Sequence, residues 1–324
     1  MSSITGRSEI DVEPSGDEAS TGRLGDRIFS GLATGSGAFV VVLIVLVAAF
    51  LVSQAVPALM DNKANFLTSR VWEVSAGSLR FGIPDLLYVT VISSIVAMLI
   101  AVPVAIAVAL FLTQYAPKRL ATPFGYLVDL LAAVPSIIFG LWGLRILAPH
   151  VTPVQNFLAD HLGWIPFFSP PVSSGTIFLA SLVLAIMILP IVTALSREVF
   201  DQTPLTHKEG ALALGATKWE MIRTAVLPFG AGGVVSAAML GLGRALGESF
   251  AVTIIVSTNP GVFRLSLFSG GETFASKIAN NASEFDTPTK AGAFIAAGLV
   301  LFILTFVVNA AARIIIERRK AFIE

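Results

Sequence analysis

The sequence contains no cysteine, and charged residues make up only 13 % of its 324 residues. The lack of cysteine excludes disulfides, iron–sulfur clusters and thiol catalysis. The three histidines, His150, His161 and His207, are too scattered along the chain to suggest a metal site. Lys and Arg together number 21, as do Asp and Glu, so no net charge points to nucleic-acid binding. The sequence also has no phosphate-binding loop and no nucleophile–His–acid set, so we expect neither an ATPase nor another enzyme within this chain.

Long apolar runs dominate the rest of the sequence. Hydrophobic residues make up 55 % of the chain, and the mean hydropathy is +0.83. A soluble domain with so few charges would struggle to cover its surface, whereas a membrane helix needs about 20 apolar residues to cross about 30 Å of hydrocarbon. The sequence therefore predicts an all-α integral membrane protein with six transmembrane helices, over residues 38–59, 86–112, 124–148, 175–196, 229–257 and 291–312.

The N-terminal segment is polar and lacks the apolar core of a signal peptide. We expect residues 1–25 to form a disordered cytosolic tail and residues 26–324 to form the transmembrane domain. Residues 21–32 fit either a short amphipathic helix on the membrane surface or a plain linker. With the N-terminus inside, the cytosolic segments hold thirteen Lys and Arg residues and the outer segments hold seven. This bias places both termini in the cytosol.

The predicted cytosolic loop over residues 197–228 carries a helix–turn–helix pattern. Residues 208–214 are rich in Ala and Leu, which favour helix. Gly215 can end that helix in a left-handed turn. A second helix is predicted to begin near Thr217 and to stop before Pro228.

This loop resembles the EAA loop of bacterial ABC-importer permeases. The residues in register are Glu209, Ala211, Gly215, Leu227 and Pro228, whereas Gly210 and Ala225 depart from the pattern. The resemblance implies that Glu209, Ala211 and Gly215 belong to a coupling helix. That helix would sit in a groove of a separate ATPase subunit, which uses ATP and Mg, and would pass on its closure as rigid-body motion. An ordinary amphipathic interfacial loop is the alternative.

Two charged residues lie within the fifth predicted span. Arg244 and Glu248 are four residues apart, so on one helix they share a face and can pair. A charge near mid-membrane costs at least about 2.5 kcal/mol, which makes a functional role the first hypothesis. Gly243 and Gly247 form a Gly-x-x-x-Gly step that lets another helix approach. We expect this span to line an interface with a second permease subunit, with the two charges on the translocation path. A buried ion pair that only fixes helix register is the alternative.

The charged pair also limits which ions the predicted transporter could carry. A guanidinium binds tetrahedral oxyanions in a bidentate way, so Arg244 favours an oxyanion. Glu248 would repel an anion, but it could hold Arg244 while the path is empty, or accept a hydrogen bond from a protonated oxyanion. Phosphate carries such protons at neutral pH and sulfate does not, so phosphate is the predicted cargo.

Two motifs, residues 134–140 and residues 243–249, resemble those of the PstC permeases of phosphate ABC importers, and the similarity runs from about residue 26 to the end. The resemblance implies the type I ABC-importer permease architecture in the bacterial cell membrane. It also implies a PstA-like second permease subunit, two PstB-like ATPases and a PstS-like phosphate-binding protein, with no cofactor in this chain. Broken helices often line substrate paths, so Pro135 and Ser136 are candidate pathway residues. A plain helix kink is at least as consistent with them.

Three other functions stay open at this point. An ABC permease for sulfate or molybdate would differ only in cargo. An ion-coupled secondary transporter would use intramembrane acids for proton coupling, but the sequence shows no inverted repeat and the loop would be unexplained. A non-transport membrane scaffold would make the Arg244–Glu248 pair structural. In the last outer loop, Arg264, Glu272 and Lys277 either meet the binding protein or are simply solvated.

Overall fold

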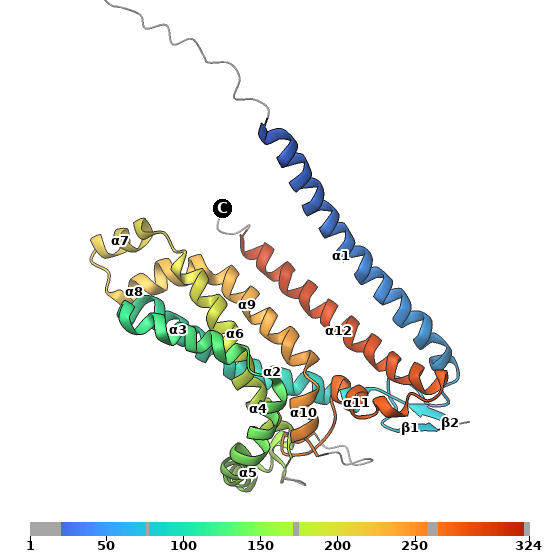
Figure 1. Cartoon of the computed structure of the whole chain (residues 1–324). Coiled ribbons are helices and arrows are strands. Elements are labelled where there is room, and N and C mark those ends of the chain that lie inside the picture. The colour runs from blue at the N-terminus through green and yellow to red at the C-terminus, as the bar shows by residue number, and fades with distance from the viewer. Residues whose placement is uncertain (1–20, 76–77, 171–174, 258–264, 321–324) are drawn as a thin grey trace, which may run out of the picture. The chain divides into compact units, whose positions relative to one another are not determined.

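The computed structural model describes residues 21–75, 78–170, 175–257 and 265–320, and it is mostly helical (Figure 1). Within these residues, six helical segments are long and apolar enough to cross a membrane: Gly25–Met60, Pro84–Tyr115, Ser136–Leu162, Ile177–Asp201, Lys218–Gly247 and Pro288–Ile314. The six predicted spans are confirmed, but the bounds of the third and fifth spans differ from the prediction.

The chain divides into two compact units, residues 1–50 and residues 51–324. In the first unit the structure describes the beginning of α1 (Thr21–Met60), whose apolar side chains are almost all exposed. The helix is continuous from Thr21, so the short surface helix considered for residues 21–32 is part of a longer one. Most of the predicted N-terminal tail, residues 1–20, lies outside the described residues.

The central helix of the second unit is α6 (Ile177–Asp201). In α6, 67 % of the most apolar stretch is buried, against at most 33 % in the other candidate spans. Along it packs α2 (Pro84–Leu110), through fully buried alanines that recur at every fourth position, namely Ala97, Ala101, Ala105 and Ala109. Small residues one turn apart let two helix backbones approach closely, which is a common way for membrane helices to associate.

Glycines play the same part on α9 (Leu227–Gly247), which also packs on α6. A methyl group added at Gly230 would lie 2.7 Å from the Phe200 ring, and one added at Gly241 would lie 2.8 Å from a methyl of Val192. Both distances are shorter than van der Waals contact, so the α6–α9 contact depends on the absence of a side chain at these two positions.

The third span does not run over residues 124–148 as predicted. A helix α3 (Lys118–Ala132) ends before Pro135, and α4 (Ser136–Trp142) begins directly after it and continues through η2 (Gly143–Leu147) into α5 (Ala148–Leu162). Proline has no backbone N–H and pushes the preceding residue out of the helical region, so the break falls at Pro135. The apolar segment long enough to cross the membrane is therefore residues 136–162, and α3 is a separate helix.

The end of α2 and the start of α9 are also modified locally. A π-helical turn, η1 (Phe111–Tyr115), follows α2, and another, η4 (Ile222–Val226), precedes α9. Short 3-10 turns occur at η3 (Pro166–Phe168) and η5 (Ala282–Glu284).

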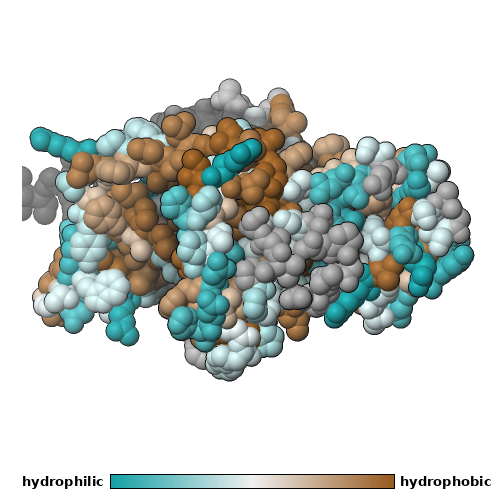
Figure 2. Space-filling view, turned by 90° about the horizontal axis from the view of Figure 1, so that it is seen from below, coloured by the Kyte–Doolittle hydropathy of each residue, from teal (hydrophilic) through white to brown (hydrophobic). Residues whose placement is uncertain are grey.

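A small β-hairpin is packed against the helices at one end of the second unit. Strands β1 (Trp72–Ser75) and β2 (Ser78–Phe81) pair antiparallel, with Trp72 opposite Phe81. The two rings pack with alanines from the end of α1 and from α12 (Pro288–Lys320). In the space-filling view from below, hydrophilic residues gather around this hairpin (Figure 2).

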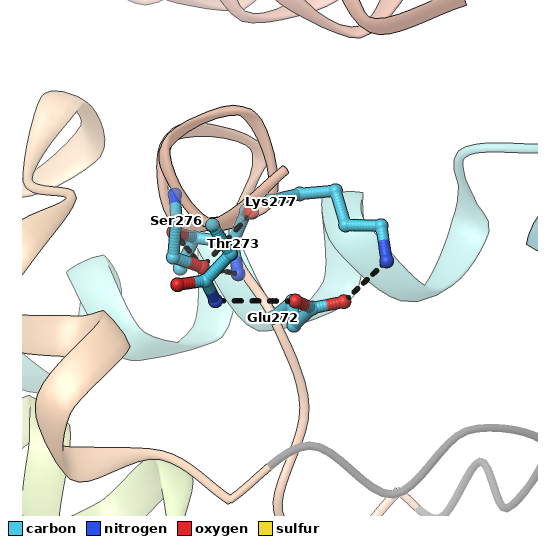
Figure 3. A network of polar contacts seen from close by, with 5 residues as sticks. Glu272, Thr273, Ser276 and Lys277 are labelled. Atoms are coloured by element: carbon cyan, nitrogen blue, oxygen red, sulfur yellow. Dashed lines mark hydrogen bonds and ion pairs between the residues drawn. The ribbon is translucent and has the colours of Figure 1, made fainter. Parts of the chain in front are cut away.

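Glu272 and Lys277, which were predicted to lie in an outer loop, form an internal pair (Figure 3). Lys277 Nζ lies 2.8 Å from Glu272 Oε2, both side chains are less than one-fifth exposed, and the ammonium lies 5.7 Å from the Trp72 ring centre. Thr273 and Ser276 cap the start of α11 (Phe274–Asn280) with reciprocal hydrogen bonds. Glu272 and Lys277 therefore bind each other rather than solvent, while Arg264 lies outside the described residues.

Candidate functional site

Two helix breaks, the one at Pro135 described above and a second one in the fifth span, bring the two sequence motifs together. The fifth span, predicted as continuous over residues 229–257, is broken: α9 ends at Gly247, and a second short helix, α10 (Phe250–Ile255), begins after Ser249. α10 packs against α4, the helix that begins after Pro135. Residues 134–140 and residues 243–249, which are far apart in the sequence, therefore flank one site.

Glycine makes the contact between α4 and α10 possible. A methyl group at Gly140 would lie 3.0 Å from the Ala251 Cα, and one at Gly143 would lie 3.2 Å from the Ile255 side chain and would overlap Val183 of α6. Backbone approach this close is available only to glycine. Gly140, the last residue of the motif at residues 134–140, thus has a packing role that the sequence alone did not reveal.

Glu248 is almost buried, with 9 % of its surface exposed. Its backbone is extended (φ −72°, ψ 123°), which ends α9, and its Oε1 accepts a hydrogen bond from the Ala251 N–H at 3.1 Å. The side chain therefore satisfies one of the free N–H groups at the start of α10. A carboxylate is a strong acceptor for such a group.

The predicted pairing of Arg244 with Glu248 is wrong for this structure. The prediction assumed one helix through both residues, but Glu248 lies beyond the last residue of α9. Among the described residues, no ion pair joins the two side chains. Nothing in residues 243–249 resembles a proline break, but the glycines at 241, 243 and 247 are the signal that helix stability is low there.

Arg244 stands in the last turn of α9, where a cation is favoured by the helix dipole. Its side chain is half-buried, and it makes no hydrogen bond or ion pair within the described part of the chain. Leu240, Gly243 and Gly247 lie on the same face of the helix, and a methyl group at either glycine would meet no atom within 4 Å. The Gly-x-x-x-Gly step is therefore open in this chain, and Arg244 lies beside it.

Pro135 and Ser136 lie at the start of α4. Pro135 is exposed, with the extended backbone that ends one helix and admits the next, and Ser136 is the first residue of α4 and half-buried. Within the described residues the Ser136 hydroxyl makes no hydrogen bond. Sequence reasoning missed Thr253 on α10, whose buried hydroxyl has no partner among the described residues. Its only signal was a hydroxyl residue just over one turn after Glu248.

The predicted coupling loop has the predicted local structure. α7 (Leu205–Ala213) is followed by Gly215 in the left-handed region (φ 85°), and α8 (Lys218–Met221) begins after Thr217. Thr217 and Glu220 form a capping box at that start. One prediction is wrong: the second helix does not stop before Pro228. The π turn η4 carries it into α9, where Pro228 falls in the first turn and its missing N–H is tolerated.

The three predicted coupling residues have different surroundings. Glu209 and Gly215 are exposed, whereas Ala211 is half-buried against a cluster that contains Ile222 and Val226. Sequence reasoning missed the exposed apolar residues of the same loop, which are Leu205, Leu212, Leu214 and Trp219, with Leu214 91 % exposed. Exposed apolar side chains gathered on one loop are typical of a protein contact surface.

The site formed at the breaks after Gly247 and at Pro135 is called the two-break site below. The predicted coupling loop and the two-break site lie at opposite ends of α9 (Figure 1). The 21 residues of α9 give it a length of about 30 Å. Among the described residues, no group of three or more His, Cys, Asp or Glu side chains could hold a metal ion. The described residues thus present an unpaired cation, Arg244, at one end of α9 and a loop with exposed apolar side chains at the other.

Comparison with protein families matches residues 101–321 to the family of the binding-protein-dependent transport system inner membrane component. The phosphate transport system permease protein PstC 2 of Mycobacterium tuberculosis is 56 % identical over 300 residues, which cover 90 % of this chain and 92 % of that protein. The PstC protein of Xylella fastidiosa (strain Temecula1) is 40 % identical over 301 residues, which cover 90 % of this chain and 91 % of that protein.

Solved structures share the fold. A chain of the inward-facing MetNI methionine ABC transporter has a TM-score of 0.51 at 18 % identity, covering 74 % of this chain and 94 % of that one. A chain of a bacterial ABC transporter involved in the import of alginate has a TM-score of 0.55 at 16 % identity, covering 91 % and 99 %. The chain belongs to the inner membrane components of binding-protein-dependent transport systems, and within that family to the PstC permeases, as a multi-pass protein of the inner membrane.

Proposed function

We propose that this chain is the permease subunit of an ATP-driven importer that carries inorganic phosphate through the inner membrane. The observation that carries the proposal is the packing of α4 on α10, the helix that begins six residues after Arg244, together with the lack of a protein partner for Arg244 among the described residues. The 56 % identity to PstC relatives supports the choice of phosphate. In this proposal the coupling loop and both termini lie in the cytosol, as the distribution of Lys and Arg predicts.

Arg244 is the proposed contact for the phosphate oxyanion. An unpaired guanidinium in a low-dielectric site attracts an anion strongly, and it can donate two parallel hydrogen bonds to a tetrahedral oxyanion. A neighbouring carboxylate would weaken that attraction, but no ion pair neutralises Arg244 in the described chain. Pro135 and Ser136, which lie at the start of α4, are the other proposed pathway residues.

Glu248 has a different proposed role from Arg244. One of its oxygens accepts the Ala251 N–H, so its first task is to hold α10 in place. A carboxylate has further acceptor sites, and we propose that one of them takes the hydrogen bond of a protonated phosphate. Sulfate carries no such proton at neutral pH, so this contact would discriminate between the two anions.

The coupling loop is the proposed contact with the ATPase. Glu209, Ala211 and Gly215 shape the helix and its turn, and the exposed leucines of the loop supply the apolar contact. A binding-protein-dependent importer needs an ATPase and a binding protein. The proposed partners are a PstA-like second permease, a PstB-like ATPase dimer that uses ATP and Mg, and a PstS-like phosphate-binding protein. The open Gly243–Gly247 face is the proposed contact for the second permease.

The test is ATP-dependent uptake of labelled phosphate into liposomes that hold the full complex, with sulfate as competitor. We expect Arg244→Gln to abolish uptake while the complex still assembles, because an oxyanion site that loses its charged donor loses about 2 kcal/mol or more of binding. Arg80→Gln is the matched control, since Arg80 is more than half exposed on the hairpin and should not affect transport.

Each contrary outcome has a separate meaning. Uptake that sulfate competes for, or uptake of sulfate or molybdate itself, would assign the chain to another oxyanion. Normal phosphate uptake by Arg244→Gln would remove Arg244 from the pathway. Uptake driven by a proton gradient without ATP would favour an ion-coupled secondary transporter.

A further inference from the structure

The helix α3 exposes most of its residues. It is 15 residues long, and Gly125 is its one buried residue. It packs chiefly on α6. At its end the break at Pro135 interrupts the backbone hydrogen bonds, so α3 can move relative to α4 by rotation about a few backbone bonds.

Arg197 of α6 contacts α3 through its guanidinium group. Its Nη2 lies 3.4 Å from Asp129 Oδ2, and only 26 % of its side chain is exposed. The guanidinium also occupies the space that a methyl group at Gly125 would fill. Gly125 and Asp129 are one turn apart, so a single planar group covers one face of α3.

This contact is unlike the other ion pairs of the described residues. The other four join residues that are at most 15 positions apart in the sequence, such as Lys277 with Glu272 and Lys290 with Asp286. The Arg197–Asp129 pair joins two helices through residues that are 68 positions apart.

Arg197 also lies close to the coupling loop. It is four residues before the end of α6, and α7 begins at Leu205 after a short turn. Phe200, three residues beyond Arg197, is fully buried in the cluster that contains Met221 and Ile222 of the loop. The end of α6 and the base of the coupling loop therefore form one packed body.

At its far end α3 leads to the candidate site. The chain passes from α3 through Pro135 into α4, and α4 packs on α10 through Gly140. A displacement of the end of α6 would thus reach α3 through Arg197, then α4 through the break, and then the segment that carries Glu248.

We propose that Arg197 is a positioning residue that transmits movement of the coupling loop to α4 by clamping α3 at Gly125 and Asp129. This inference rests on the proposed function, because it requires an ATPase that moves the loop. Rigid-body movement of packed elements is a known means of such transmission. Arg197 touches no substrate in this scheme, and its loss should separate ATP hydrolysis from transport rather than stop both.

The experiment uses the full complex in liposomes and measures two quantities in the same sample: ATP hydrolysis stimulated by the binding protein, and phosphate uptake. The variants are Arg197→Gln, Asp129→Asn, their double variant, and Gly125→Ala, which displaces the guanidinium without changing any charge. Gly37→Ala is the glycine control, because a methyl group there meets no atom within 4 Å. Arg197→Lys, which keeps the charge, should restore part of the coupling.

We expect each single variant to lower the ratio of phosphate taken up to ATP hydrolysed by about tenfold, the size of an ordinary coupling between sites. The double variant should be no worse than either single one, because both remove the same contact. Uptake and hydrolysis that fall together in an assembled complex would overturn the proposal and leave the pair a structural role. An unchanged ratio in all variants would also overturn it.

Failure of the proposed function would look different. If the wild-type complex takes up another oxyanion, the cargo is wrong, and the same ratio measured with that anion still tests Arg197. If the wild-type complex shows no ATP-dependent uptake of any anion, the importer proposal fails, and the clamp proposal fails with it.

Discussion

Two glutamates, one near each end of α9, each cap the start of a different short helix, and they differ in their exposure to water. Glu220 is exposed, and it completes a capping box with Thr217 at the start of α8. Glu248 is 91 % buried, and it accepts the Ala251 N–H at the start of α10. The local chemistry is similar, but water can replace the first contact and cannot easily reach the second. The fold around the buried cap therefore depends on that cap, whereas the exposed cap only adds to the stability of its own helix.

The largest effect should follow removal of the buried cap. Glu248→Ala would leave the Ala251 N–H unsatisfied in a buried site, which costs about 1–3 kcal/mol, and would remove the proposed contact for a protonated phosphate. We expect loss of uptake together with a lower melting temperature of the complex. Glu248→Gln keeps an acceptor for the N–H but loses the charge, so it should keep the melting temperature near wild type while uptake falls. Normal phosphate uptake and unchanged selectivity in Glu248→Gln would contradict the proposed contact.

A smaller effect should follow a steric change on α4, next to Glu248. Gly140→Val would push a branched side chain against the Ala251 backbone, and overpacking of this kind costs about 1–3 kcal/mol. We expect a lower melting temperature and weaker uptake. Gly35→Val is the control, because no atom lies within 4 Å of a methyl group there in this chain and Gly35 belongs to neither the candidate site nor the proposed subunit contact. Equal melting temperatures for the two variants would show that α4 and α10 do not pack as closely as described.

The smallest effect should follow loss of the exposed cap. Thr217→Ala removes one side-chain acceptor at the start of α8, and an exposed cap of this kind contributes about 1 kcal/mol to helix stability. We expect faster hydrogen exchange confined to the first amides of α8, with uptake unchanged. Thr217→Ser retains the acceptor and should exchange like the wild type. An effect on uptake as large as that of Glu248→Ala would contradict the contrast between the two ends.

The coupling end was largely predictable from the sequence because its structure is local. The Gly turn at Gly215 needs one residue with a positive φ, and the start of α8 needs only Thr217 and Glu220, three positions apart. Nothing distant has to be known for either. The continuation through Pro228 was missed, because a π turn shifts the hydrogen-bond pattern in a way that residue types do not encode.

The two-break end was predictable in its residues but not in its geometry. The sequence singled out the motifs at residues 134–140 and 243–249, whose role in a site stays a prediction, and it indicated an interruption at Pro135. The break after Gly247 was not, and the Arg244–Glu248 pair was inferred from a helix that does not continue. The contact between α4 and α10 depends on Gly140, which meets the distant backbone of Ala251, and no local pattern reports that contact.

By itself, the sequence determined that this is a six-span membrane protein, because long apolar runs can be satisfied only by helices in lipid. It also determined which residues carry the unusual chemistry, since intramembrane charge and Gly or Pro breaks are visible one residue at a time. The tertiary structure decided where the fifth span ends, which partner each charge finds, and that the two motifs meet. Those features depend on close backbone approach and on a buried carboxylate finding one N–H, and both arise only when segments far apart in the chain pack together.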